Sequence, residues 1–269
     1  MISHAAGTLP GPHRQFLDRA VERLAADPRI VGVAVAGSYL DDTMDEYSDV
    51  DLVVAVEPAN YTEVIQERKQ IAASLGSLLV AFTGEHVGEP RLLICLYDSP
   101  LLHVDLKFVS VADMGGRVDD PAVLWERDGR LTAVLPSGVG KYPPPDPQWI
   151  EDRFWVWMHF MGAKIGRGEW FEAMESLSFL RSKVLGPLGL RAQGLRPTGV
   201  RRIELIAPSL ADELKQTIAT HDAHSLLAAT RGCIALYRRL RAAEPTSLQL
   251  HSAAEAAAVA YLRDIEARQ

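Results

Sequence analysis

The pattern of apolar and polar positions divides the chain into a first part that mixes helices and strands and a second part that is helical. Apolar residues at helical spacing predict an amphipathic helix over 13–27, and the valine-rich run 30–37 predicts a strand covered on both faces. The following runs predict a strand, a helix and three more strands, over 49–56, 62–76, 77–82, 91–97 and 101–110. This order indicates an α+β domain around a mixed sheet of about five strands.

The second part of the chain shows helical periodicity and no strand pattern. It follows "LPSGVGKYPPPDPQ", whose density of proline and glycine makes it the best linker in the sequence. Apolar residues recur at helical spacing over 149–186, 199–219, 224–244 and 248–269. We therefore expect two domains, residues 1–145 with the mixed sheet and residues 146–269 as an α-helical bundle.

Composition and charge narrow the possible functions. No apolar run is long enough for a membrane span, and the N-terminus lacks a signal-peptide pattern, so we expect a cytoplasmic protein. Cys95 and Cys233 each lie in an apolar segment, which indicates buried small hydrophobic residues and neither a zinc site nor a disulfide framework. The sequence does not determine the oligomeric state and is compatible with a dimer.

The charge is unevenly distributed along the chain. Of the net charge of -7, residues 1–145 contribute -9, from 21 acidic and 12 basic side chains, and residues 146–269 contribute +2, from 14 acidic and 16 basic ones. An acidic domain repels nucleic-acid phosphates and attracts cations. A metal or a polycationic small molecule is therefore a more natural partner than nucleic acid.

Three acidic residues are candidates for a shared site. Asp49 and Asp51 are two positions apart at the start of a predicted strand, so their side chains project from the same face. Asp105 interrupts the apolar strand 101–110, and it joins the pair if the two strands are neighbours. The other acids available for the third position are Glu85, Glu89 and Asp98.

Clustered carboxylates need a compensating cation, because like charges at close range raise the pKa of one member or bind a divalent ion. Mg²⁺ fits best, since it uses one or two protein carboxylates together with water and substrate phosphates. Two ions would activate an acceptor hydroxyl and neutralise a leaving pyrophosphate. Gly37 and Ser38, at the end of the first strand, would let the backbone and a hydroxyl approach those phosphates.

The stretch "GSYLDDTMDEYSDVDLVV", residues 37–54, contains Gly37, Ser38, Asp49 and Asp51. It resembles the nucleotidyltransferase signature of the DNA polymerase β superfamily. The resemblance covers residues 30–110. It implies that Gly37 and Ser38 contact the nucleotide phosphates, that Asp49 and Asp51 bind metal, and that Asp105 shares a metal or acts as base. A helical bundle after such a domain is similar to the aminoglycoside and lincosamide nucleotidyltransferases of antibiotic resistance.

The same resemblance suggests roles for residues in the bundle. In "AKIGRGEW" Lys164 would reach the phosphates, and Glu169 or Glu172 would contact a cationic acceptor. A helical lysine or glutamate is otherwise a solvated surface residue.

These observations predict a Mg²⁺-dependent enzyme that transfers a nucleoside monophosphate, AMP from ATP, to a hydroxyl of an aminoglycoside-like small molecule and releases pyrophosphate. One alternative keeps the fold and modifies a protein or a tRNA end, as in toxin–antitoxin pairs. The other is a non-catalytic nucleotide-binding module, which the intact acids disfavour.

Overall fold

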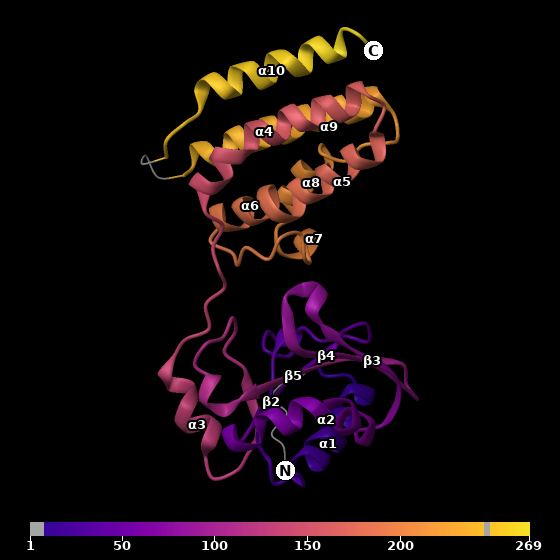
Figure 1. The fold of residues 1–269 in the computed structure, drawn as a ribbon, viewed down its shortest axis with the longest axis vertical. Helices are drawn as coiled ribbons and strands as arrows, with labels where there is room; N and C mark the ends of the chain where they lie inside the picture. Colours follow the sequence, from indigo (N-terminus) through magenta and orange to yellow (C-terminus); the bar gives the residue numbers. More distant parts are fainter. Residues whose placement is uncertain (1–7, 245–247) are drawn as a thin grey trace. The chain divides into compact units, whose positions relative to one another are not determined.

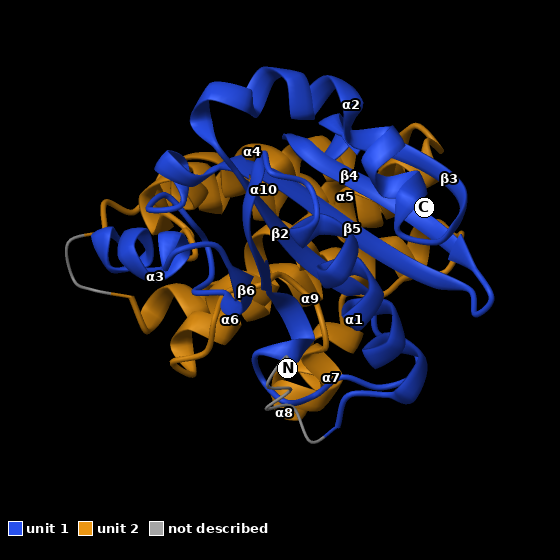
Figure 2. Cartoon of the chain, turned by 90° about the horizontal axis from the view of Figure 1, so that it is seen from below, with its two compact units in different colours: residues 1–141 blue, residues 142–269 orange. Residues whose placement is uncertain are grey.

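The computed structural model describes residues 8–244 and 248–269. Its contacts group the chain into two compact units, residues 1–141 and 142–269 (Figures 1 and 2). We describe each unit by itself. The division into two functional domains with a boundary at residue 145 stays a prediction.

Unit 1 is built around a six-stranded sheet (Figure 1). The strands are β1 (Ile30–Val35), β2 (Val50–Val56), β3 (Ser77–Gly84), β4 (Glu89–Asp98), β5 (Leu102–Ser110) and β6 (Ala122–Glu126). The helices are α1 (Gly11–Ala25), α2 (Tyr61–Ser74) and α3 (Arg130–Val134). The strand order is β3-β4-β5-β2-β1-β6.

The sheet is mixed because β2 and β5 run parallel, whereas their other neighbours pair antiparallel. The predicted fold class, a mixed sheet followed by a helical region, is confirmed. The predicted strand number of about five was one too low. The missed strand is β6, a short edge strand whose side chains are only partly buried and show no apolar alternation.

The two faces of the sheet are covered differently. The larger core lies where α1 and α2 pack, and it includes Phe16, Leu17, Val64 and Phe108. A smaller cluster on the other face contains Leu131 of α3 together with Val31, Ala34, Ala55 and Val109. Polar side chains can therefore occupy the rest of this second face.

Unit 2 consists of helices, and we find no strand among its described residues. The helices are α4 (Pro147–Gly166), α5 (Trp170–Leu180), α6 (Gly186–Ala192), α7 (Ile203–Ile206), α8 (Pro208–Lys215), α9 (Ala223–Ala242) and α10 (Ser252–Glu266). In the core Phe154 of α4 stacks on Tyr237 of α9, with ring centroids 3.8 Å apart. None of the helices described for either unit is both long and apolar enough to cross a membrane.

A buried carboxylate links three segments of unit 2. The side chain of Glu151 on α4 is fully enclosed. It accepts hydrogen bonds from Trp155 Nε1 (3.1 Å), the Tyr237 hydroxyl (2.6 Å) and the backbone N–H of His251 (3.0 Å), and it pairs with Arg241 at 3.2 Å. Burial raises the pKa of Glu151, but the hydrogen bonds from Tyr237 and His251 bring this pKa below its ordinary value.

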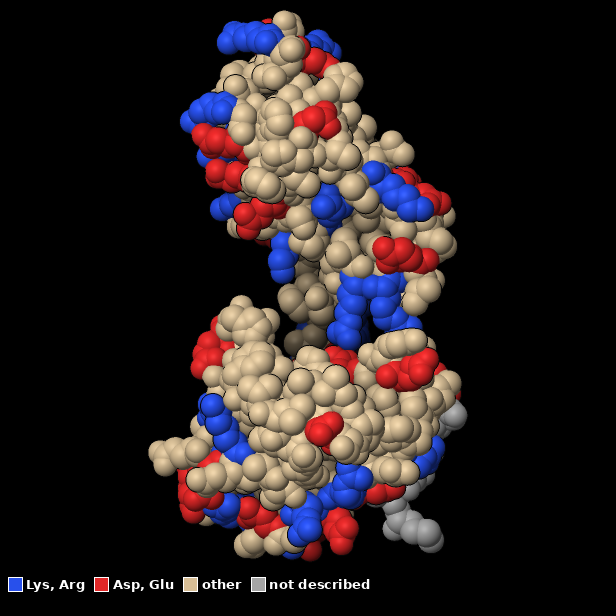
Figure 3. All heavy atoms as spheres, turned by 90° about the vertical axis from the view of Figure 1, so that its right-hand side faces the viewer, with Lys and Arg blue, Asp and Glu red and all other residues tan. Residues whose placement is uncertain are grey.

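Acidic and basic side chains are interspersed on the faces that Figure 3 shows. The acidic excess of the first half therefore does not form one continuous field on the visible face of unit 1. Cys95 and Cys233 are buried and unpaired, as predicted. Burial raises the pKa of each thiol to about 12, so both are neutral at physiological pH.

Candidate active site

The parallel pairing of β2 with β5 brings the three predicted acids together. Asp51 and Asp105 are direct partners in the strand register, and Asp49 precedes β2 by one residue. Each carboxylate offers an oxygen within 4.8 Å of the other two, and all three side chains are half-buried. The alternation of β2 and β5 buries the flanking residues Val50 and Val104 in the large core, which leaves the acids on the opposite face.

Gly37 makes room for this cluster. It follows β1 with a φ of +64°, a conformation that favours glycine, and opens the short 3-10 turn Gly37–Tyr39. A Cβ atom at this position would lie 1.9 Å from Oδ2 of Asp51. The neighbouring Ala36 N–H donates to the Asp51 carbonyl at 2.9 Å, which fixes the turn against β2. Gly37 therefore permits both the turn and the position of the Asp51 carboxylate.

We expect Gly37→Ala to lower activity by about a hundredfold, because an ångström-scale shift of a reacting group costs about that much. The added methyl group displaces the Asp51 carboxylate, and the positive φ costs a further 1–2 kcal/mol of stability, roughly. The matched control is Gly88→Ala, where φ is +75° and a Cβ would meet no atom within 4 Å. Steady-state rates and thermal melts of both variants check this. Equal loss of activity in the two variants would contradict the steric explanation.

Ser38 supplies a polar group beside the acids. Its Oγ atom is buried and has no hydrogen-bond partner among the residues that the structure describes. The Ser38 carbonyl is held instead by Thr43, whose backbone N–H donates at 3.1 Å. A buried hydroxyl costs free energy unless it is hydrogen-bonded, so Ser38 is suited to contact an external oxygen such as that of a phosphate.

The acidic loop before Asp49 has a structural explanation at two of its positions. Asp45 caps its own turn by accepting from the Tyr47 N–H (3.0 Å) and the Ser48 hydroxyl (2.9 Å), and Asp42 accepts from Thr8 N–H at 3.1 Å. The buried His13 of α1, through its Nε2 atom, lies 2.7 Å from the Ser48 carbonyl. No sequence pattern predicts this contact, which anchors the residue just before Asp49.

The surroundings of Asp105 distinguish it from Glu89, one of the other acids considered for the third carboxylate of the site. His103 Nε2 lies 3.0 Å from Asp105 Oδ1 on the same face of β5. Glu89 instead accepts from Arg91 at 2.7 Å and pairs with Lys107 at 2.9 Å. The Arg91 guanidinium, followed by the Lys107 ammonium, outweighs the opposing effect of burial and holds the pKa of Glu89 at about 2. The negative charge of Glu89 is therefore already compensated by Arg91 and Lys107, whereas Asp105 belongs to the cluster of three carboxylates.

The three candidates in unit 2 lie together. Lys164 Nζ, on a side chain that is only 13% exposed, is 2.5 Å from Glu169 and 2.8 Å from Glu172. Hydrogen bonds to these two carboxylates raise the pKa of Lys164. Their predicted roles, phosphate contact for Lys164 and acceptor binding for the glutamates, stay predictions.

Comparisons with known proteins agree with the signature. A family model described as "Nucleotidyltransferase domain" matches residues 14–87, a range that contains Gly37, Ser38, Asp49 and Asp51. A comparison with curated proteins finds no match.

Among solved structures, an aminoglycoside 6-adenyltransferase from Bacillus subtilis is 16% identical with a TM-score of 0.39, covering 94% of this chain and 98% of its own. A nucleotidyltransferase-like protein from Exiguobacterium sibiricum is 14% identical with a TM-score of 0.37, covering 84% and 74%. A STING-associated CdnE c-di-GMP synthase from Capnocytophaga granulosa is 11% identical with a TM-score of 0.31, covering 87% and 82%. The family match places a nucleotidyltransferase domain at residues 14–87, in agreement with the DNA polymerase β-type signature of this part of the chain.

Proposed function

We propose that this enzyme uses Mg²⁺ and a nucleoside triphosphate, ATP, to transfer a nucleoside monophosphate to a hydroxyl of a small molecule. The observation that carries the proposal is the convergence of Asp49, Asp51 and Asp105 next to Gly37. Three carboxylates within 4.8 Å of one another suit a hard divalent cation. The buried Oγ of Ser38 suits a phosphate oxygen at the same place.

Each residue has a role in this proposal. Asp49 and Asp51 hold the metal, and Asp105 shares it or receives the proton of the acceptor hydroxyl. Gly37 and Ser38 hold the phosphates through the backbone N–H groups and the Ser38 hydroxyl. When bound, the metal supplies Lewis-acid activation of the hydroxyl and neutralises phosphate charge. The acceptor oxygen bonds to the α-phosphorus, the bond from the α-phosphorus to its bridging oxygen breaks, and pyrophosphate leaves.

The negative net charge of residues 1–145 supports a cationic acceptor such as an aminoglycoside. In the loop before Asp49, the acids Asp41 and Glu46 are exposed, and neither appears in the hydrogen bonds that stabilise the turn. Exposed negative charge close to a site raises the local concentration of polycations. The acceptor contact predicted for Glu169 and Glu172 of unit 2 stays a prediction, since both carboxylates are paired with Lys164.

Incubating the full-length protein with labelled ATP, Mg²⁺ and a panel of aminoglycosides and lincosamides tests the proposal. We expect one acceptor to gain an AMP group, detected by mass spectrometry, and we expect EDTA to abolish the transfer. Parallel reactions contain tRNA or a cell extract as the source of a protein acceptor.

The outcomes separate the candidate functions. Label on a protein or a tRNA end, with none on any drug, would overturn the small-molecule acceptor while keeping nucleotidyl transfer. Turnover that continues in EDTA would contradict the metal requirement. ATP binding without transfer to any acceptor would favour a nucleotide-binding module.

A further inference from the structure

Positive charge is concentrated in one segment of unit 2. Residues 176–203 hold six basic side chains and no acidic one, whereas the rest of residues 146–269 hold ten basic and 14 acidic ones. The segment runs from the end of α5 through α6 to the start of α7 (Figure 1). The positive net charge of the second half of the chain therefore comes entirely from this segment.

Two of the six cations are used inside unit 2. Arg181 donates to the Thr217 carbonyl at 2.6 Å. Arg191 pairs with Glu244 at 2.7 Å and donates to the Pro145 carbonyl at 3.1 Å. The other four cations are exposed, and we call them the basic surface: Lys183, Arg196, Arg201 and Arg202.

Close backbone packing brings the two parts of the basic surface together. The loop after α6 folds back on the turn that holds Lys183, so closely that a Cβ atom at Gly199 would lie 2.8 Å from the Ser182 carbonyl oxygen. A Cβ atom at Gly186 would lie 2.3 Å from the Gly199 carbonyl oxygen. Ser182 precedes Lys183, and Gly199 is two residues from Arg201, so the cations of both parts project from neighbouring stretches of backbone. Exposed positive charge gathered in this way attracts a polyanion.

An aromatic ring lies beside the basic surface. The Arg196 guanidinium is over the ring of Tyr142, with its Cζ atom 6.0 Å from the ring centroid, and this half-buried tyrosine also belongs to unit 2. Aromatic rings and arginine planes are the groups on which unpaired bases stack, while nearby cations hold the phosphates. The ring therefore favours a nucleic acid over an acidic protein, and RNA is the nucleic acid that is commonly recognised through unpaired nucleotides.

The border of the basic surface has other chemistry as well. Glu204 is exposed there, and so are the apolar side chains of Val200, Leu205 and Ile206, which are 39%, 73% and 42% exposed. Apolar groups beside cations also suit an anionic membrane surface. A membrane is therefore the competing partner that an experiment has to separate from RNA.

We propose that the basic surface of unit 2 binds single-stranded RNA, with phosphates on its cations and an unpaired base against Tyr142. The expectation against nucleic acid came from the acidic charge of residues 1–145 and does not extend to this segment. The inference goes beyond the proposed function and is independent of it, because binding requires neither a particular acceptor nor transfer.

Fluorescence anisotropy of the full-length protein with a labelled oligouridylate tests the phosphate contacts. We expect log affinity to fall with log salt at a slope of about -2.8, from about 0.7 for each of four contacts. Arg201→Gln and Lys183→Gln should each reduce this slope by about 0.7. Arg263→Gln is the matched control, because it removes the same charge from an exposed position on α10, outside the basic surface, and should leave the slope unchanged.

Replacing Tyr142 tests the stacked base. Tyr142→Ala should weaken binding of the oligouridylate by about tenfold, whereas Tyr142→Phe keeps the ring and should stay within about twofold. Circular dichroism of each variant establishes that the fold is retained. Equal losses in the two Tyr142 variants would contradict stacking.

Three further results would overturn the proposal. The first is polyglutamate or duplex DNA binding as tightly as the oligouridylate, and the second is an equal loss in Arg201→Gln and Arg263→Gln. The third is binding to vesicles of equimolar phosphatidylcholine and phosphatidylglycerol without binding to the oligouridylate, which would assign the surface to a membrane. Nucleotidyl transfer to a small molecule is unaffected by each of these results.

Discussion

Asp51→Asn is expected to lower nucleotidyl transfer by about a thousandfold. A metal contributes several kcal/mol of charge stabilisation, roughly, and about 1.4 kcal/mol corresponds to a tenfold change in rate. The amide of asparagine keeps the size of the side chain but loses the negative charge that faces Asp49 and Asp105. The measurement is the initial rate of AMP transfer at saturating ATP, together with the Mg²⁺ concentration that gives half the maximal rate.

Asp41→Asn is the matched control for this variant. Asp41 is an exposed acid of the same loop and lies outside the group of three carboxylates. Its replacement removes the same charge from unit 1 and should keep transfer within about twofold at high acceptor concentration, because the exposed loop is screened by salt. Circular dichroism of both proteins establishes that the fold is retained. An Asp51→Asn enzyme with more than a tenth of the normal rate would refute the metal-binding role of Asp51.

The largest expected effect on stability comes from Glu151→Ala. Removing one partner of a buried ion pair costs about 3–5 kcal/mol, because the remaining charge and donors stay buried without a partner. Here the Tyr237 hydroxyl and the Trp155 N–H lose the acceptor, and among the described residues the Arg241 guanidinium keeps only its ion pair with Glu255 at 2.9 Å. Chemical denaturation followed by tryptophan fluorescence is the measurement, since four of the five tryptophans lie in unit 2.

Asp152→Ala is the control for Glu151→Ala. This neighbouring carboxylate on α4 is 45% exposed and is paired with His251 at 2.9 Å. Exposed ion pairs contribute about 0–1 kcal/mol, so the midpoint of its transition should move little. If Glu151→Ala unfolds at the same denaturant concentration as Asp152→Ala, the buried network does not stabilise unit 2 in the way we describe.

The fold class and the position of the acid cluster could be predicted because they depend on local patterns. Asp49 and Asp51 alternate with apolar residues, so their shared face follows from strand geometry alone. Adding Asp105 required one assumption, that its strand is a neighbour of β2, and the register of β2 with β5 supports it. The helical character of unit 2 followed from periodicity in the same way.

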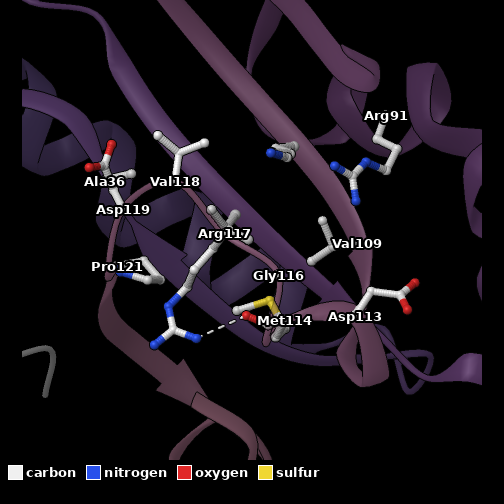
Figure 4. A pocket seen from close by; sticks show the side chains of 12 residues that line it. Ala36, Arg91, Val109, Asp113, Met114, Gly116, Arg117, Val118, Asp119 and Pro121 are labelled. Atoms are coloured by element: carbon white, nitrogen blue, oxygen red, sulfur yellow. Dashed lines mark hydrogen bonds between the residues drawn. The ribbon is translucent and has the colours of Figure 1, made fainter. Parts of the chain in front are cut away.

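Features that depend on contacts distant in sequence could not be predicted. β6 is held by pairing with β1, and its own five residues carry no alternation that would reveal a strand. The contact of His13 with the Ser48 carbonyl and the clearance that Gly37 gives to Asp51 arise only when separate segments are packed together. The cavity that residues of 113–121 line together with residues of β2, β4 and β5 likewise has no sequence motif, because its lining comes from separate segments (Figure 4).

The parallel alignment of β2 with β5 determines the order in which the three acids are synthesised. During synthesis the chain emerges from its N-terminus, so the turn at Gly37 and both acids of β2 are made well before β5. Between them come α2, β3 and β4, and parallel neighbours cannot be joined without such a crossover. The third carboxylate is thus added last to the centre, and an incompletely translated polypeptide that ends before β5 lacks one of the three acids.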